Sequence, residues 1–399
     1  MTLSIRDAAR EHPDAPAIIT SSKTYSFAEC ARAIDALPDR DYLIAEPTVA
    51  TIFAVYRALE TARPLALIHS KQAPAIQDRQ RALVHDVPAG TAFVLFTSGT
   101  TGDSKGVCLS RDAIIAAARA SEARLGWRDD DCWLLALPMA HSGGLSIVVR
   151  CLLARKPLIL VEHSIEREMS IATIASLVPA QLAELVEGSP QNLRAIILGG
   201  AAAMPSLVER AVSRGWPVLQ SYGLTETFGQ IATATTPGGP LELLPGVVIT
   251  ATDPITIRAP QLATQYLHGA AIAPELRTSD LGELVGETLT VLGRHDDVIN
   301  TGGEKVHPLE VERVLVATPG VTAACVFGVP DSHYGAVVAA IVSTSEQFDR
   351  THAILTWHAQ LAPHARPRRF AIVDRLPALP SGKPDRRAIA ALPTEPLHY

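Results

Sequence analysis

The sequence predicts an α/β protein with a large N-terminal domain of layered α/β sheets, a small β-rich section and a small α+β domain at the C-terminus. Three observations support this. Apolar runs of strand length alternate with amphipathic stretches in the first half of the chain, a segment rich in Pro and Gly follows at 235–245, and a different pattern begins after Arg294. We therefore expect two domains, with boundaries at 1–295 and 296–399.

The strands of the large domain are predicted from runs that are apolar throughout, which suits strands covered on both faces. These runs lie at 92–96, 133–137, 157–161 and 195–198. Helices are predicted from the amphipathic stretches at 112–125, 165–177 and 205–214. This alternation favours a mainly parallel sheet.

The later elements are shorter. Segments 247–258 and 284–292 alternate between apolar and polar residues, as short antiparallel strands do. Pro308 stands where a helix to Val316 would begin, and proline is favoured in a first helical turn. Strands are expected at 321–329 and 337–343.

Composition restricts the class of protein and its partners. Of 399 residues, 47% are hydrophobic and 19% charged, which is typical of a packed chain. The net charge of −6 gives no bulk attraction to nucleic acid or anionic lipid. Five scattered cysteines form no zinc pattern and no disulfide framework, and charges interrupt the most apolar stretch at 145–161. We expect a cytoplasmic protein without a membrane span.

The clearest local motif is the loop FTSGTTGDSKG at 96–106, directly after a predicted strand. Its hydroxyls, its glycines and one lysine could bind polyphosphate oxygens through side-chain donors, backbone N–H groups and a cation. The spacing is not that of a Walker loop, because Gly102 and Lys105 are separated by two residues. On composition alone, a phosphate cradle and a flexible turn both remain open.

This loop resembles the phosphate-binding loop of the adenylate-forming superfamily, which includes acyl- and aryl-CoA ligases, luciferase and the adenylation domains of peptide synthetases. The family usually has proline before the lysine, where Ser104 stands here. Five more segments resemble family motifs in the family's order: LGGAAAMP at 198–205, SYGLTET at 221–227, TSDLGEL at 278–284, 292–312, and LPSGKPDR within 379–386.

The resemblance implies an ATP site. Tyr222 would offer a flat face to the adenine, Glu226 a carboxylate to Mg²⁺, and Asp280 its oxygens to the ribose hydroxyls. The implied ATP-binding residues are Thr97, Ser98, Gly99, Thr100, Thr101, Gly102, Lys105, Gly200, Ala201, Ala202, Tyr222, Gly223, Thr225, Asp280 and Arg294.

The resemblance also implies a mobile C-terminal domain. Lys383 would neutralise charge between the substrate carboxylate and the α-phosphate, and the implied catalytic residues are Lys383, Glu226 and Thr97. Asp296 matches the family's hinge, about which this domain rotates for the second half-reaction. Gly302 and Gly303 match the loop that lines the tunnel for CoA.

Segments at 136–146, 176–185 and 193–205 resemble the aryl-CoA ligase branch, in particular the o-succinylbenzoate–CoA ligases of menaquinone biosynthesis. His141 would then lie at the mouth of the acid pocket, together with Gly199 and Gly200. Two features depart from this branch: the section before the loop is short, and Glu184 stands where a base would pair with the succinyl carboxylate. A plain aromatic acid therefore competes as substrate.

Arg150 and Arg258 are candidate anion partners that the sequence does not place. The expected function is an ATP-dependent, AMP-forming acid–CoA ligase that uses ATP, Mg²⁺ and CoA. The alternatives are a stand-alone enzyme that loads a carrier protein and a nucleotide-binding relative without catalysis. A homodimer stays open.

Overall fold

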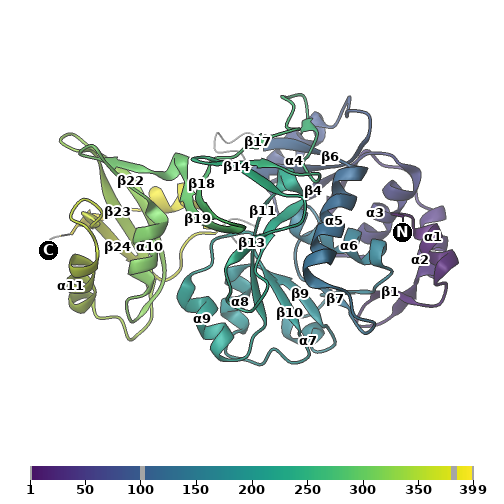
Figure 1. Ribbon diagram of the computed structural model, residues 1–399, viewed down its shortest axis with the longest axis horizontal. Coiled ribbons are helices and arrows are strands. Elements are labelled where there is room, and N and C mark those ends of the chain that lie inside the picture. The colour runs from purple at the N-terminus through teal and green to yellow at the C-terminus, as the bar shows by residue number, and fades with distance from the viewer. Residues whose placement is uncertain (1, 99–103, 379–383, 398–399) are drawn as a thin grey trace. The chain divides into compact units, whose positions relative to one another are not determined.

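The computed structural model describes residues 2–98, 104–378 and 384–397. The chain divides into two compact units. The first comprises Met1–Ala203, Arg210–Thr250 and Ile257–Leu276, and the second Met204–Glu209, Ala251–Thr256 and Arg277–Tyr399. Each unit combines helices with sheets (Figure 1), so the predicted α/β class is confirmed. The domain boundary at residue 296 stays a prediction.

The first unit contains a sheet with the order β16-β6-β5-β4-β3. Its strands are β3 (Tyr42–Ala45), β4 (Leu65–His69), β5 (Thr91–Ser98), β6 (Ser104–Ser110) and β16 (Gln265–Tyr266). Strands β3, β4 and β5 are parallel, whereas β6 is antiparallel to β5. The run predicted at 92–96 is the centre of β5, where Val94 and Phe96 are buried in one apolar cluster with Ile68.

A second series of strands in the same unit has the order β13-β12-β11-β10-β9-β7-β8-β1-β2. Its strands are β1 (Pro16–Ile19), β2 (Thr24–Ser26), β7 (Trp133–Leu135), β8 (Leu158–Leu160), β9 (Ile174–Leu177), β10 (Ala195–Leu198), β11 (Val218–Leu224), β12 (Gly229–Thr233) and β13 (Leu241–Leu243). The pairings from β1 through β8, β7, β9 and β10 to β11 are parallel. The parallel arrangement is confirmed, but the strands belong to two sheets rather than one.

Helices connect these strands. They are α1 (Ile5–Glu11), α2 (Phe27–Asp35), α3 (Val49–Thr61), α4 (Pro74–Leu83), α5 (Arg111–Leu125), α6 (Ser142–Ala154), α7 (Ile165–Met169), α8 (Pro179–Leu185) and α9 (Pro205–Ser213). Helices α5 and α6 lie side by side (Figure 1). No helix within the described ranges is both long and apolar enough to cross a membrane.

The helix expected over 165–177 is wrong in its second half. Helix α7 ends at Met169, and Ile174–Leu177 is strand β9. This strand pairs with β10 on one side and β7 on the other, and all four of its residues are buried. Burial on both faces and two ladders of hydrogen bonds override the helical spacing of the apolar residues.

The second unit contains a hairpin of β18 (Asp280–Val285) and β19 (Thr288–Arg294) and a 3₁₀ turn, η2 (His295–Asp297). There follow β20 (Ile299–Thr301), β21 (Glu304–Val306), α10 (Pro308–Val316), β22 (Val321–Asp331), β23 (Gly335–Thr344), α11 (Arg350–Gln360), β24 (Arg369–Val373), α12 (Arg386–Ala390) and β25 (Glu395–Pro396). A separate small sheet has the order β14 (Val248–Thr252), β15 (Ile255–Arg258) and β17 (Leu276–Arg277).

The second unit has its own core. Helix α10 has the predicted bounds, and its buried residues Val311 and Leu315 join Trp357 and Phe370 in one apolar cluster. The strands predicted at 321–329 and 337–343 are confirmed as parts of β22 and β23. Strands β22 and β23 form an antiparallel pair at one edge of a sheet with the order β22-β23-β24-β25.

Candidate nucleotide and acid site

The predicted phosphate loop joins β5 to β6. The two strands are antiparallel, with Thr97 opposite Lys105, and the Thr97 hydroxyl donates to the Lys105 carbonyl oxygen at 3.5 Å. Ser98 is the last residue of β5. The loop residues Gly99, Thr100, Thr101 and Gly102 lie outside the described residues. The described flanks therefore fix the two ends of the loop as neighbours in one sheet.

Lys105, Tyr266 and Glu226 form a chain of contacts beside this loop. The Lys105 ammonium lies 5.5 Å from the centre of the Tyr266 ring, and the Tyr266 hydroxyl donates to Glu226 Oε1 at 3.0 Å. Burial and the Glu226 charge raise the pKa of Tyr266 above its usual range, so the phenol remains a donor. Tyr266 was missed in the sequence, where no motif marks it, because only the pairing of β16 with β6 brings it here.

Glu226 is compatible with a magnesium site. It lies in the 3₁₀ turn η1 (Thr225–Thr227), and Tyr266 holds one oxygen of its carboxylate. The described residues contain no cluster of three metal-ligating side chains. Mg²⁺ commonly takes one or two carboxylates and completes its shell with substrate phosphates and water, so one glutamate fits this cation.

The turn that carries Glu226 follows β11, which contains Tyr222 and Gly223. A Cβ atom on Gly223 would lie 1.9 Å from the Gly229 carbonyl oxygen, so the close approach of β12 excludes any side chain. Thr227 Oγ1 accepts the Leu224 N–H at 3.1 Å and donates to the Gly229 oxygen at 2.7 Å. Strand packing therefore accounts for the glycine of this motif and for the position of Thr225.

The segment after β10 holds Gly199, Gly200, Ala201 and Ala202. A Cβ atom on Gly199 would lie 2.6 Å from Ser221 Oγ, and Gly200 has a φ of +80°, which favours glycine. Strands β10 and β11 are parallel neighbours. Because the carboxyl ends of parallel strands share an edge, this segment and Tyr222 lie at the edge where ligands bind in open α/β sheets.

His141 begins α6 at its N-cap position and contacts a second histidine that the sequence analysis missed. The rings of His141 and His69 are 5.0 Å apart between centres. His69 ends β4, and continuing the register of β4 with β5 sets it beside Thr97. His69 therefore lies between His141, the candidate for the acid pocket, and Thr97, which flanks the phosphate loop.

His69 is held as a neutral ring. The Lys71 N–H donates to its Nδ1 at 3.0 Å, which assigns the proton to Nε2, and burial lowers the pKa of the ring. The Nε2 atom is buried and has no hydrogen-bond partner within the described structure. An unpaired buried donor costs about 1–3 kcal/mol. A lone histidine after an apolar strand was the only signal for it in the sequence.

The two candidate anion partners differ. Arg258 is exposed and forms an ion pair with Glu275 at 2.6 Å. Arg150 is 5% exposed, lies over the Trp133 ring at 5.2 Å, and has no ion pair among the residues the structure describes. Burial lowers the pKa of Arg150 to about 10, which still leaves it charged at neutral pH. Its Nη2 lies 4.0 Å from the position that a Cβ atom on Gly229 would take.

The side chain of Glu184 is on the exposed face of α8. It therefore does not bring a negative charge into the protein interior.

In the second unit, Asp280 and Arg294 lie opposite each other in the β18–β19 hairpin. Arg294 Nη1 lies 3.4 Å from Asp280 Oδ1, and its Nη2 lies 3.6 Å from Asp296 Oδ2. The residues predicted for the ribose and for the hinge are therefore electrostatically linked.

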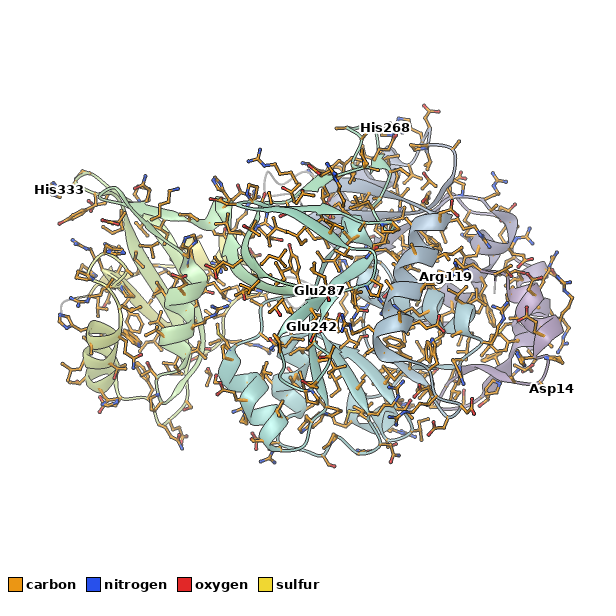
Figure 2. All side chains as sticks on the ribbon, viewed as in Figure 1. Asp14, Arg119, Glu242, His268, Glu287 and His333 are labelled. Carbon is orange, nitrogen blue, oxygen red and sulfur yellow. The ribbon has the colours of Figure 1, made fainter. Side chains whose placement is uncertain are left out.

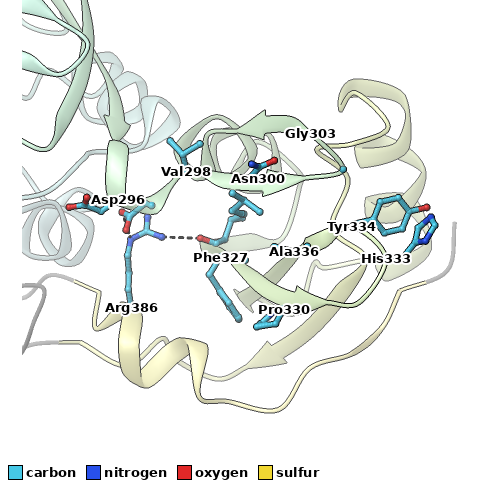
Figure 3. A pocket seen from close by; sticks show the side chains of 16 residues that line it. Asp296, Val298, Asn300, Gly303, Phe327, Pro330, His333, Tyr334, Ala336 and Arg386 are labelled. Carbon is cyan, nitrogen blue, oxygen red and sulfur yellow. Dashed lines mark hydrogen bonds and ion pairs between the residues drawn. The ribbon is translucent and has the colours of Figure 1, made fainter.

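Asp296, Gly302 and Gly303 line a cavity of about 870 Å³ within the second unit (Figure 3). The two glycines form the turn between β20 and β21 with φ of +61° and +89°, values that a two-residue hairpin turn requires. Turn geometry alone accounts for both. His333 lies at the turn between β22 and β23 (Figure 2) and lines the same cavity (Figure 3). Lys383 lies outside the described residues.

Comparisons with known proteins identify the family. Residues 44–257 match the AMP-binding enzyme family, and residues 310–383 match the AMP-binding enzyme C-terminal domain. The chain belongs to the AMP-binding enzyme family. The adenylate-forming resemblance of the sequence motifs is thereby confirmed.

Curated relatives are named for a specific activity within this family. The chain is 35% identical over 337 residues to a 2-succinylbenzoate–CoA ligase of Bacillus mycoides, covering 76% of this chain and 70% of that protein. It is 35% identical over 325 residues to the enzyme of the same name in Listeria monocytogenes, covering 75% and 69%. The predicted class of enzyme, an AMP-forming acid–CoA ligase, is confirmed.

Solved structures of o-succinylbenzoate CoA synthetase have the same fold as this chain. An o-succinylbenzoate CoA synthetase of Bacillus subtilis in complex with its acyl-adenylate intermediate superposes with a TM-score of 0.86 at 25% identity, over 100% of this chain and 99% of that chain. The same enzyme with ATP and magnesium gives a TM-score of 0.83 at 26% identity, over 97% and 98%.

Proposed function

We propose that this protein is a 2-succinylbenzoate–CoA ligase. It activates one carboxylate of the acid with ATP and Mg²⁺ as an acyl-adenylate, releases pyrophosphate, and transfers the acyl group to CoA. The similarity to ligases of that name over three quarters of the chain supports the activity. The observation that carries the choice of a dicarboxylic acid is Arg150, a buried cation without an ion pair in the described structure.

In the first half-reaction, a substrate carboxylate oxygen attacks the α-phosphorus and the bond to pyrophosphate breaks. No protein nucleophile is needed, so the chain supplies position and charge. Lys105 and the loop between β5 and β6 bind phosphate oxygens, and Tyr266 orients the Glu226 carboxylate. Mg²⁺, bound by Glu226, would neutralise charge on the leaving pyrophosphate. Lys383 places a further cation at the reacting carboxylate.

Two groups of residues bind the rest of ATP. Tyr222 and the segment from Gly199 to Ala202 receive the adenine, and Asp280 with Arg294 receives the ribose. The ion pair between Asp280 and Arg294 supports this assignment, because it holds both side chains ready for the two sugar hydroxyls.

The second half-reaction uses a rotation of the C-terminal part about Asp296. CoA sulfur then attacks the acyl carbonyl, AMP leaves, and Gly302 and Gly303 line the path of the thiol arm. Their positive φ values favour glycine, and glycine leaves the turn without side chains, which suits a narrow ligand.

Arg150 is the partner we assign to the second carboxylate of the acid. A buried guanidinium is costly without a counter-charge, and a dicarboxylic substrate supplies one. His141 lies at the start of the same helix, α6.

The test measures pyrophosphate release with 2-succinylbenzoate, benzoate, anthranilate and fatty acids, and thioester formation with free CoA. We expect 2-succinylbenzoate to give the highest kcat/KM. A higher kcat/KM with a plain benzoate would remove the dicarboxylate assignment. Adenylation without transfer to free CoA would favour the alternative acceptor, a carrier protein. A homodimer and a cytoplasmic location stay predictions.

A further inference from the structure

Arg386 is a charged residue of the second unit that the proposed reaction leaves without a role. It is the first residue of α12 and lies three positions after Lys383 in the sequence. Its Nη2 donates to Glu312 Oε1 at 2.8 Å, its Nη1 donates to the Val326 carbonyl oxygen at 2.9 Å, and its Nε lies 3.6 Å from Asp297 Oδ2. One guanidinium thus connects α10, β22 and the turn η2.

The partner Glu312 makes this position rigid. Its carboxylate is 5% exposed and also accepts the Val326 N–H at 2.9 Å. Burial raises the pKa of Glu312, and the guanidinium beside it opposes that shift. A buried carboxylate with one cationic partner fixes that partner in place, because losing the cation leaves an uncompensated charge.

The segment before Arg386 is closed at its base. Ala378 and Pro384 form an antiparallel bridge on either side of residues 379–383. The Asp385 N–H donates to the Pro377 carbonyl oxygen at 2.9 Å, and Asp385 Oδ1 accepts the Ala388 N–H at 3.0 Å. The residues on either side of 379–383, which we call the lysine segment, therefore pair with each other and form its base. Arg386 connects this base to Asp297.

Asp297 is the neighbour of Asp296 in η2, and Figure 3 shows the Arg386 side chain extending from α12 toward Asp296. We propose that Arg386 is a positioning residue for Lys383: it holds the base of the lysine segment in a fixed place relative to the hinge turn. When the C-terminal part rotates at Asp296, the base of the lysine segment then keeps its position relative to η2. This inference rests on the proposed function.

The first experiment compares R386M, R386K and the control R387M, with each half-reaction assayed separately. Arg387 is the adjacent arginine and is exposed. We expect R386M to slow adenylate formation about 10–100-fold, as misplacement of a catalytic group by about 1 Å does, and to leave thioester formation from supplied acyl-adenylate within about twofold. R386K, which retains a cation for Glu312, should restore part of the first rate, and R387M should match the parent.

Because R386M leaves Glu312 buried and unpaired, the double variant R386M/E312M removes both charges and should show the same selective loss with a higher Tm than R386M. Equal decreases in both half-reactions, or a first half-reaction at the parent rate, would overturn the assignment.

Hydrogen exchange tests the connection independently of substrate. In R386M, and not in R387M, the backbone amides of 385–390 and 295–299 should both lose protection. Unchanged exchange in either segment overturns the connection, even if the parent activates no acid and the proposed function fails.

Discussion

Glu226 in the first unit and Arg386 in the second are both charged residues beside a family motif, but the structure uses them differently. The Glu226 carboxylate has one hydrogen bond in the described structure, from Tyr266. The Arg386 guanidinium meets two carboxylates and a backbone carbonyl. The proposed roles agree with this difference: the group assigned to bind Mg²⁺ keeps coordinating capacity, and the group assigned to position a segment has its capacity filled by protein.

The largest effect is expected from Lys383, which should behave as a ligand-binding group. Lys383→Ala should slow adenylate formation by about 10²–10³-fold, the usual loss for one preorganised charge, and spare thioester formation from supplied acyl-adenylate. Rapid-quench assays of each half-reaction measure this. Equal losses in both steps would contradict its assignment to the first.

The hinge assignment predicts the opposite selectivity. Asp296 lies in a 3₁₀ turn, whose φ near −60° proline accepts, so Asp296→Pro should leave adenylation nearly unchanged. Because proline prevents φ rotation, thioester formation should fall by about tenfold or more. Separate assays of pyrophosphate and thioester decide the matter, and normal thioester formation would exclude rotation about this residue.

Arg150 should separate two classes of acid. Arg150→Lys keeps the charge but loses the planar fork, so KM for 2-succinylbenzoate should rise about tenfold while KM for benzoate changes little. Arg258→Lys, a change at an exposed and already paired arginine, is the matched control. If KM rises equally for both acids, Arg150 serves the fold and not the second carboxylate.

A smaller effect concerns the metal requirement. Glu226→Gln should raise the Mg²⁺ concentration for half-maximal adenylation several-fold, since an amide is a poorer ligand than a carboxylate. Tyr266→Phe removes the hydrogen bond that orients this carboxylate and should shift the same titration less. A flat response in both variants would remove this pair from the metal site.

The smallest effect is on stability and comes from His69. Its pKa is lowered by burial, so below the ordinary value of 6.5 the unfolded chain binds more protons and stability falls as the pH decreases. His69→Gln can still accept the Lys71 N–H and should flatten the dependence of Tm on pH below about 6.5. An unchanged slope would mean that His69 does not titrate on unfolding.

The local sequence predicted most elements well, because their determinants lie within a few residues. Pro308 at a first turn gave α10 its observed start, and continuous apolar runs gave β5 and β10. The prediction was wrong at 174–177, where the spacing of apolar residues suits a helix or a strand. There, pairing with the neighbouring strands determines that the segment is a strand.

By itself the sequence determined the family, the order of its motifs and the glycines that turns require, and it predicted the charged residues of the candidate site. Tertiary structure alone assigned Tyr266 to Glu226 and His69 to His141, identified Arg150 rather than Arg258 as the unpaired cation, and connected Arg386 to Glu312. These partners come from separate elements, and their contacts depend on strand register and packing. The spacing of residues along the chain does not encode strand register or packing, so these partners can be identified only from the assembled sheets.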